Sequence, residues 1–213
     1  MNGYDTNEIY ISGKIVGEPV LTKNYYGEGF FEFKLESERL SKRTDVVPVM
    51  VSERLTNGIE LKEGVSIAVM GEIRTYNRVE NGKSKLFVHV FVSRFVDVPE
   101  RNTNRVSLSG YICKPPVFRL TPEGREITDI LLAVNRRYGK SSYVPIITWG
   151  RTARFCESLP TGVFVSVEGR FQSREYTKKF SETESEQRIA YEVSASCVSL
   201  TEDFVNDEWE DAQ

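Results

Sequence analysis

Aromatic and basic side chains alternate with apolar ones in three segments of the chain, residues 127–138, 143–151 and 163–176. Successive side chains of a β-strand point to opposite faces, so each segment is predicted to bury one face. In the middle segment the buried face would hold Val144, Ile146 and Thr148, and the other face would hold Tyr143, Pro145, Ile147 and Trp149. In the last segment the buried set is predicted to be Val163, Val165, Val167 and Phe171, and the exposed set Phe164, Arg170, Gln172, Arg174 and Tyr176. Rings that stack on bases and cations that contact phosphates are typical of faces that bind single-stranded nucleic acid.

Each of these residues also has a purely structural interpretation. Tyr and Trp are common in strands because they pack well there, and an exposed Arg is usually only solvated. The nucleic-acid interpretation gains from the combination, since three separate segments place rings and cations opposite an apolar set.

The composition of the 213 residues, 39% hydrophobic and 28% charged, fits one large or two small globular domains. No apolar run approaches the roughly 18 residues of a membrane span, and the N-terminus lacks the order of a signal peptide. A cytoplasmic protein, nucleoid-associated if it binds DNA, is expected. Three distant cysteines, Cys113, Cys156 and Cys197, lack metal-ligand spacing and are predicted to be buried apolar residues.

An enzyme is the least favoured class. The chain has a single histidine, His89, within an apolar strand, and it contains no P-loop, HExxH or GxSxG motif. The acidic residues form no obvious metal site, so neither a cofactor nor a metal is expected.

The net charge of −3 is unevenly distributed. Residues 104–201 carry 14 Lys and Arg against 10 Asp and Glu, whereas residues 202–213 carry six acids and no base. The half with the rings is therefore the basic half, which is compatible with binding a single strand. The acidic end is predicted to be disordered, and it is either a solubilising end or a docking peptide for partner proteins.

The chain repeats itself, and the repeat decides the expected architecture. Residues 7–15 return as 104–112 and residues 47–49 as 144–146, at a shift of 97; residues 64–65 return as 162–163 after one insertion. The predicted domains are 1–99 and 104–201, followed by the tail 202–213. Strands are predicted at 8–16, 30–38, 46–52, 65–76 and 86–95, and at 105–113, 127–136, 143–149, 163–176 and 189–198.

A short helix is predicted between the third and fourth strands of each repeat, from the spacing of Leu55 with Ile59 and of Phe155 with Leu159. Five strands with one helix in that place is the order of an OB-fold. The expected fold is therefore all-β, with two tandem five-stranded Greek-key barrels of the OB type. Pro48 and Pro145, which cannot donate to a ladder, are expected at an edge or a bulge.

Residues 104–200 resemble the bacterial single-stranded DNA-binding protein (SSB) family across nearly its whole domain. The similar segments are LAVNRRY at 132–138, TWGR at 148–151 and VSVEGR at 165–170, continued by Arg174 and Tyr176. The resemblance implies sequence-non-specific binding of single-stranded DNA in replication, recombination or repair. It also implies base stacking by Tyr138, Tyr143, Trp149 and Tyr176, and phosphate contacts by Arg136, Arg137, Arg170, Arg174 and Lys178.

The first half resembles the family only weakly, because Ser41, Val46 and Ser52 stand where the second half has Tyr138, Tyr143 and Trp149. Its second strand presents Glu32, Lys34, Glu36 and Glu38, and its fourth presents Arg74, Tyr76 and Arg78 on one face. A mainly structural role is expected for this half. The family usually assembles four barrels, so two barrels per chain imply a homodimer. The chain also lacks the family's usual Pro-Phe end, which keeps open an alternative: an OB-fold protein-interaction or primosome-like accessory module with weak nucleic-acid binding.

Overall fold

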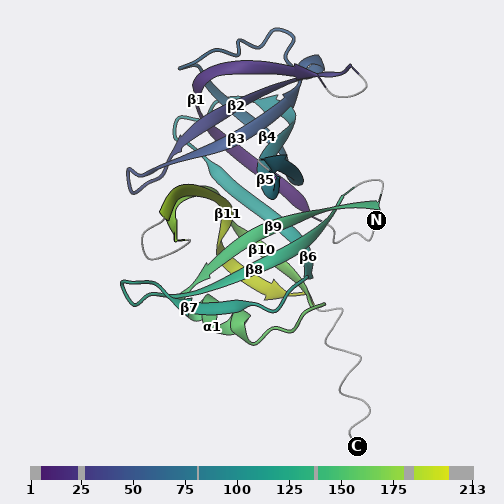
Figure 1. Cartoon of the computed structure of the whole chain (residues 1–213). Coiled ribbons are helices and arrows are strands. Elements are labelled where there is room, and N and C mark those ends of the chain that lie inside the picture. Colours follow the sequence, from purple (N-terminus) through teal and green to yellow (C-terminus); the bar gives the residue numbers. More distant parts are fainter. Residues whose placement is uncertain (1–5, 24–26, 81, 137–138, 180–184, 202–213) are drawn as a thin grey trace, which may run out of the picture. The chain divides into compact units, whose positions relative to one another are not determined.

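The computed structural model describes residues 6–23, 27–80, 82–136, 139–179 and 185–201 (Figure 1). The chain divides into two compact units. The N-unit comprises residues 8–105 together with 171–192, and the C-unit comprises residues up to 7, 106–170 and those from 193 onward. The predicted acidic tail, 202–213, lies outside the described residues.

The barrel of the N-unit has the closed strand order β1-β2-β3-β5-β4, with β4 returning to β1 (Figure 1). All neighbouring strands are antiparallel except β3 and β5, which are parallel at Val49 and Met50. Apolar side chains of alternate positions fill the interior, as the period of two requires. The strands are β1 (Asn7–Lys23), β2 (Gly29–Glu38), β3 (Thr44–Ser52), β4 (Ser66–Glu80) and β5 (Lys83–Val96).

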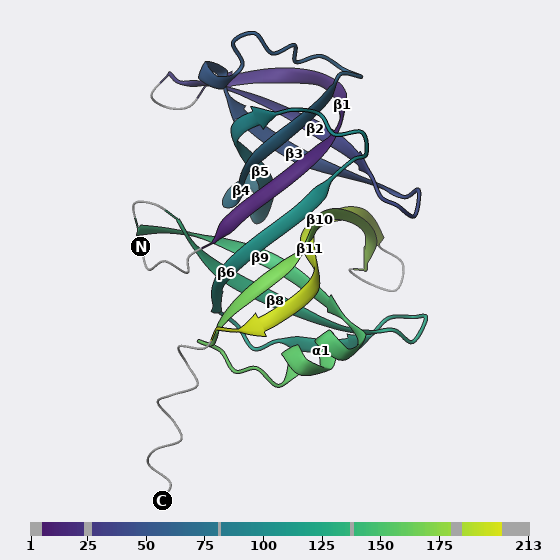
Figure 2. The ribbon, with the colours of Figure 1, turned by 180° about the vertical axis from the view of Figure 1, so that it is seen from behind.

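The C-unit repeats this order with β6, β8, β9, β11 and β10, and β10 returns to β6 (Figure 2). Its elements are β6 (Asn104–Ile112), β7 (Val117–Leu120), β8 (Glu126–Arg136), β9 (Lys140–Trp149), α1 (Gly150–Glu157), β10 (Phe164–Lys179) and β11 (Ser185–Leu200). Residues 171–192 of β10 and β11 belong to the N-unit. The prediction of an all-β chain with two OB-fold barrels is confirmed.

The short strand β7 was not predicted. In the N-unit, β1 continues to Lys23 with a register shift between Val16 and Val20, whereas in the C-unit β6 ends at Ile112 and pairing with β8 resumes at Val117. Two consecutive prolines, Pro115 and Pro116, occupy the gap. Neither can donate to a ladder, so the strand is interrupted there.

The predicted helices are only partly right. In the first repeat a single 3-10 turn, Glu53–Leu55, replaces the expected helix, and both Leu55 and Ile59 are exposed. Gly58, with φ 75°, follows the turn and prevents a helix from continuing to Ile59. In the second repeat α1 does form, but it buries Ala153 and Cys156 rather than Phe155. Thr128 Oγ1 donates to the Ala153 carbonyl at 2.8 Å, which fixes that face against β8.

All three cysteines were predicted to be buried, but their environments differ. Cys156 is buried, and burial raises its pKa to about 11. Cys113 is partly exposed, and Cys197 is exposed near the end of β11. The prediction of three buried cysteines is thus right for Cys156 only. Among the described residues, no helix combines the length and apolar character that crossing a bilayer requires.

Candidate nucleic-acid interface

The outer face of the β8–β9 hairpin carries the two described rings that the C-unit contributes to the predicted site. Tyr143 lies opposite Ala133, and Trp149 lies opposite Ile127. Val144, Ile146 and Thr148 are buried on the other face, as the alternation predicts. Tyr143 is 48% exposed and Trp149 is partly exposed. The strand therefore presents two accessible rings, six residues apart, on one face. Ile147, which alternation places on that same face between them, is buried.

Trp149 is held in place by a neighbouring strand. Its indole Nε1–H donates to Ser194 Oγ at 3.2 Å, and Ser194 lies opposite Ile147 in the parallel pairing of β9 with β11. Ser194 is positioned in turn by Gly169 of β10, where a Cβ would lie 2.4 Å from the Ser194 carbonyl oxygen. Only glycine permits this close approach, so Gly169 indirectly helps to orient the Trp149 ring.

A third ring on this surface was not predicted. Tyr111 of β6 lies opposite Ala133 in the β6–β8 register, and Ala133 lies opposite Tyr143. Tyr111 is 39% exposed and packs edge-on against Phe164, with ring centroids 4.9 Å apart. The sequence offers no aromatic pattern around Tyr111; only the strand register brings it next to Ala133. The contact also explains why Phe164, predicted to be exposed, is buried.

Two predicted arginines lie in the described part of the C-unit. Arg136 ends β8 opposite Lys140 and is partly exposed. By strand alternation it shares the face of Leu132 and Val134 rather than that of Tyr143. Arg170 follows Gly169 on β10 and is also partly exposed. The predicted Arg137 and Tyr138 lie outside the described residues, as does the side chain of Lys178.

Arg174 and Tyr176 belong to the N-unit by their contacts. Arg174 forms two hydrogen bonds with Glu192, Nε to Oε1 at 2.8 Å and Nη2 to Oε2 at 3.0 Å. Its guanidinium carbon also lies 5.7 Å from the centroid of the Tyr176 ring, which is 36% exposed. Arg174 therefore meets an internal carboxylate first, and a phosphate there would have to share the guanidinium with Glu192.

Glu192 was missed by sequence reasoning, and Gln172 was placed wrongly. Gln172 was predicted to be exposed but is buried, with its Nε2 donating to Glu192 Oε1 at 3.0 Å. Glu192 is itself buried. The available signal was an acidic residue directly between Tyr191 and Val193 of the predicted strand. A buried carboxylate requires hydrogen-bonding partners. The polar side chains of the neighbouring strand, Gln172 and Arg174, were the candidates for that role.

The outer face of the N-unit barrel also carries rings and cations. Arg74, Tyr76 and Arg78 share one face of β4, as predicted. The cross-strand register places Phe87 opposite Tyr76 and His89 opposite Arg74, and Arg74 lies over the ring of Phe91 at 3.5 Å. The β5 residues were not predicted, because their role depends on the pairing with β4.

Comparisons with known proteins agree on the fold and on the second repeat. The wild-type single-stranded DNA binding protein from Thermus aquaticus has a similar structure, with a TM-score of 0.72 over 92% of this chain and 93% of that one. The sequence identity is 20%, so this likeness concerns the fold alone. Within the sequence, the model of the "Single-strand binding protein family" matches residues 103–200.

Two curated relatives, both called single-stranded DNA-binding proteins, match part of the chain. The protein from Caldanaerobacter subterraneus is 38% identical over 78 residues, 33% of this chain and 52% of its own length. The chain thus spans about half of that relative. Single-stranded DNA-binding protein 2 from Streptococcus agalactiae is 30% identical over 106 residues, 46% of this chain and 77% of its own length. The family model matches the second repeat, and this relative is matched over most of its own length. The chain therefore belongs to the single-strand binding protein family.

Proposed function

We propose that this protein binds single-stranded DNA with little sequence preference through the outer face of the C-unit barrel. The observation that carries the proposal is that Tyr143 and Trp149 share one accessible face of β9. At about 3.3 Å per residue the two ring positions are roughly 20 Å apart along the strand, which allows each ring to stack on a different base. Every base has a flat face, so stacking of this kind discriminates little between sequences.

The proposed phosphate contacts are Arg137 and Arg170, and also Arg136 from the end of β8, where it lies on the strand face opposite to that of Tyr143. Tyr138 is proposed as a further stacking ring. Tyr176 and Lys178 belong to residues 171–192, which are part of the N-unit, and they are proposed as further contacts beyond the C-unit face. Arg174 is a weaker candidate than the resemblance alone implies, because Glu192 already neutralises its charge in part. The relatives are named for binding single-stranded DNA, and the family is one of binding proteins rather than enzymes. The proposed setting is replication, recombination or repair in the cytoplasm.

The test uses the fluorescence of Trp149. Because Trp209 is the other tryptophan of the chain, the titration is made with a Trp209→Phe variant. A thymine oligonucleotide is expected to quench the signal at low salt. If four cations contact phosphates, log K should fall with log salt with a slope of about −3, since each contact contributes about 0.7 for single strands. Absence of quenching at low salt would contradict the proposal.

We further propose that two chains associate into a homodimer, which would bring four barrels together as the family resemblance implies. Multi-angle light scattering of the full chain is expected to give twice the chain mass at micromolar concentration. A mass equal to one chain across that range would exclude the dimer as the working form.

A further inference from the structure

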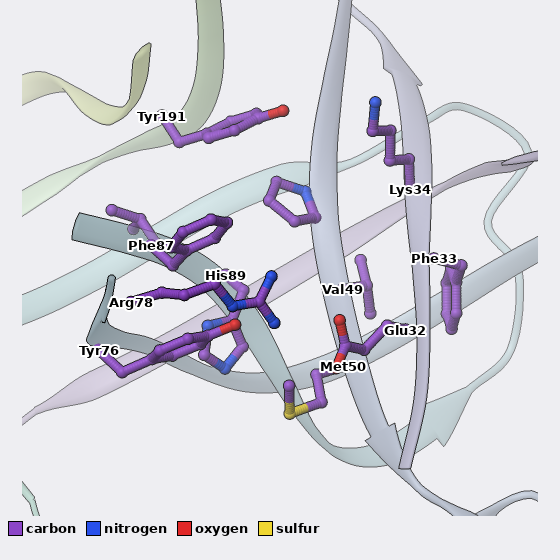
Figure 3. A pocket seen from close by; sticks show the side chains of 12 residues that line it. Glu32, Phe33, Lys34, Val49, Met50, Tyr76, Arg78, Phe87, His89 and Tyr191 are labelled. Atoms are coloured by element: carbon purple, nitrogen blue, oxygen red, sulfur yellow. The ribbon is translucent and has the colours of Figure 1, made fainter. Parts of the chain in front are cut away.

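A cavity of about 280 Å³ lies on the outer face of the N-unit barrel (Figure 3). This volume is just below the range of about 300–1,000 Å³ for pockets that take drug-sized ligands, so the cavity suits a smaller fragment such as a nucleobase. The cavity shares no residue with the C-unit face proposed above. It is lined by Glu32, Phe33, Lys34, Pro48, Val49, Met50, Tyr76, Arg78, Phe87, Val88, His89 and Tyr191.

One wall of the cavity is aromatic. Tyr76 and Phe87 are opposite each other in the β4–β5 register and stack with centroids 5.5 Å apart and planes 11° from parallel. The rings of His89 and Tyr76 form a T-shaped contact, with centroids 5.4 Å apart and planes at 68°. Tyr191, from the 171–192 segment of the same unit, adds a further ring to the lining. Such a stack continues favourably with another flat ring, because offset parallel rings attract beyond the area they bury.

The charged groups of the lining face each other. The Arg78 guanidinium carbon lies 4.8 Å from the centroid of Phe87 and 5.9 Å from that of Tyr76. In Figure 3, Arg78 and Glu32 extend into the same space from opposite sides. Glu32 is oriented by Thr22, whose Oγ1 donates to Glu32 Oε1 at 3.1 Å. The cavity thus combines a cation beside the rings with a carboxylate across from them.

We propose that this cavity binds one unpaired nucleobase, and that Glu32 makes it selective for guanine over thymine. The base would stack on the Tyr76–Phe87 wall with its phosphate at Arg78. A carboxylate only accepts hydrogen bonds. Guanine presents two neighbouring donors, N1–H and the exocyclic amino group, whereas thymine presents one N–H flanked by two carbonyl oxygens. Carbonyl oxygens repel a carboxylate, so thymine is the disfavoured base.

In this site the carboxylate of Glu32 has a role other than repelling phosphate. From the sequence alone, Glu32 should repel phosphate and count against nucleic-acid binding in the first repeat. A carboxylate that meets the edge of a base instead of its phosphate contributes selectivity, as acidic side chains do when they accept from base amino groups. The phosphate is then left to Arg78, on the far side of the cavity.

The test exploits His89, which is the only histidine of the chain and lines the cavity. Its imidazole NMR signals in the 213-residue chain therefore report this site alone. Titration with deoxyguanosine monophosphate is expected to shift them saturably, with a Kd at least fivefold below that for thymidine monophosphate. Unshifted signals at saturating nucleotide, or equal Kd values for the two nucleotides, would overturn the proposal.

Two variants show which residues are responsible. Glu32→Gln is nearly isosteric and supplies both a donor and an acceptor, so the two Kd values should converge while the signals still shift. Tyr76→Ala should weaken both nucleotides at least fivefold, and unchanged affinity in this variant would exclude the stacking wall. In a Trp149→Ala chain the His89 response should persist, so this proposal and the C-unit function fail separately.

Discussion

Replacement of both Tyr143 and Trp149 by alanine is expected to weaken binding of a thymine oligonucleotide about 30-fold or more at low salt. Loss of one stacked ring costs about 1–3 kcal/mol per base, so two rings are worth at least about 2 kcal/mol, and each 1.4 kcal/mol is tenfold in affinity. Both side chains lie on the accessible face of β9, and the buried face keeps Val144, Ile146 and Thr148. Fluorescence anisotropy of an end-labelled oligonucleotide measures the change.

A matched control is Phe155→Ala in α1. Phe155 is 39% exposed, belongs to the same unit and is of similar size, but it lies on the helix rather than on the β8–β9 face. The affinity of the Phe155→Ala variant for the oligonucleotide should stay within about twofold of the parent, because the change removes aromatic surface without removing a stacking partner. Circular dichroism on heating verifies that both variants fold. If the double variant binds within threefold of the parent, stacking on β9 is not the source of affinity.

The elements could be predicted from the sequence because strand alternation is local. Val144, Ile146 and Thr148 alternate with Tyr143 and Trp149 within seven residues, and the period of two fixes their faces without knowledge of any neighbour. The repeat at a shift of 97 then transferred each assignment to the other half. Because five strands with a helix-like segment after the third occur in both halves, the same barrel was predicted for each.

The contacts that refine the site depend on strands that are distant in sequence. Nothing near Tyr111 indicates that Ala133 will lie opposite it, and nothing near Tyr76 indicates Phe87 as its stacking partner. The pairing of Arg174 with Glu192 spans 18 residues and depends on the register of β10 with β11. One-residue changes of register turn a side chain to the opposite face, so local patterns cannot specify these partners.

The inward face of α1 shows a related limit. Helical spacing correctly indicated a helix and correctly selected Leu159, which is buried just beyond the end of α1. It also selected Phe155, which is exposed, and it missed Ala153 and Cys156, which are fully buried. Small side chains pack where the helix backbone approaches β8 closely enough for Thr128 to bond the Ala153 carbonyl. Size complementarity against a specific strand decided the face, and hydrophobicity alone does not contain that information.

Arg39→Ala is expected to lower the free energy of unfolding by about 3 kcal/mol, because it leaves the buried Asp45 carboxylate without its cation. This is the lower end of the cost for a fully buried pair, since Arg39 itself is partly exposed. Asp45 is fully buried and accepts from Arg39 Nε at 2.6 Å, with a second bond from Nη2. It also accepts from the Ser173 N–H at 3.3 Å, while Ser173 Oγ accepts from the Val46 N–H at 3.0 Å. Loss of the guanidinium leaves the Asp45 charge buried without its cation. Urea unfolding of the full chain measures the change.

Two further variants show whether the loss of stability comes from the Arg39–Asp45 ion pair or from the loss of any positive charge. Arg43→Ala removes an exposed cation four residues away and should change stability by no more than about 0.5 kcal/mol. Arg39→Ala combined with Asp45→Asn should recover part of the loss, because a neutral amide costs far less to bury than an uncompensated carboxylate. If the double variant is no more stable than Arg39→Ala, the loss comes from packing of the Arg39 stem.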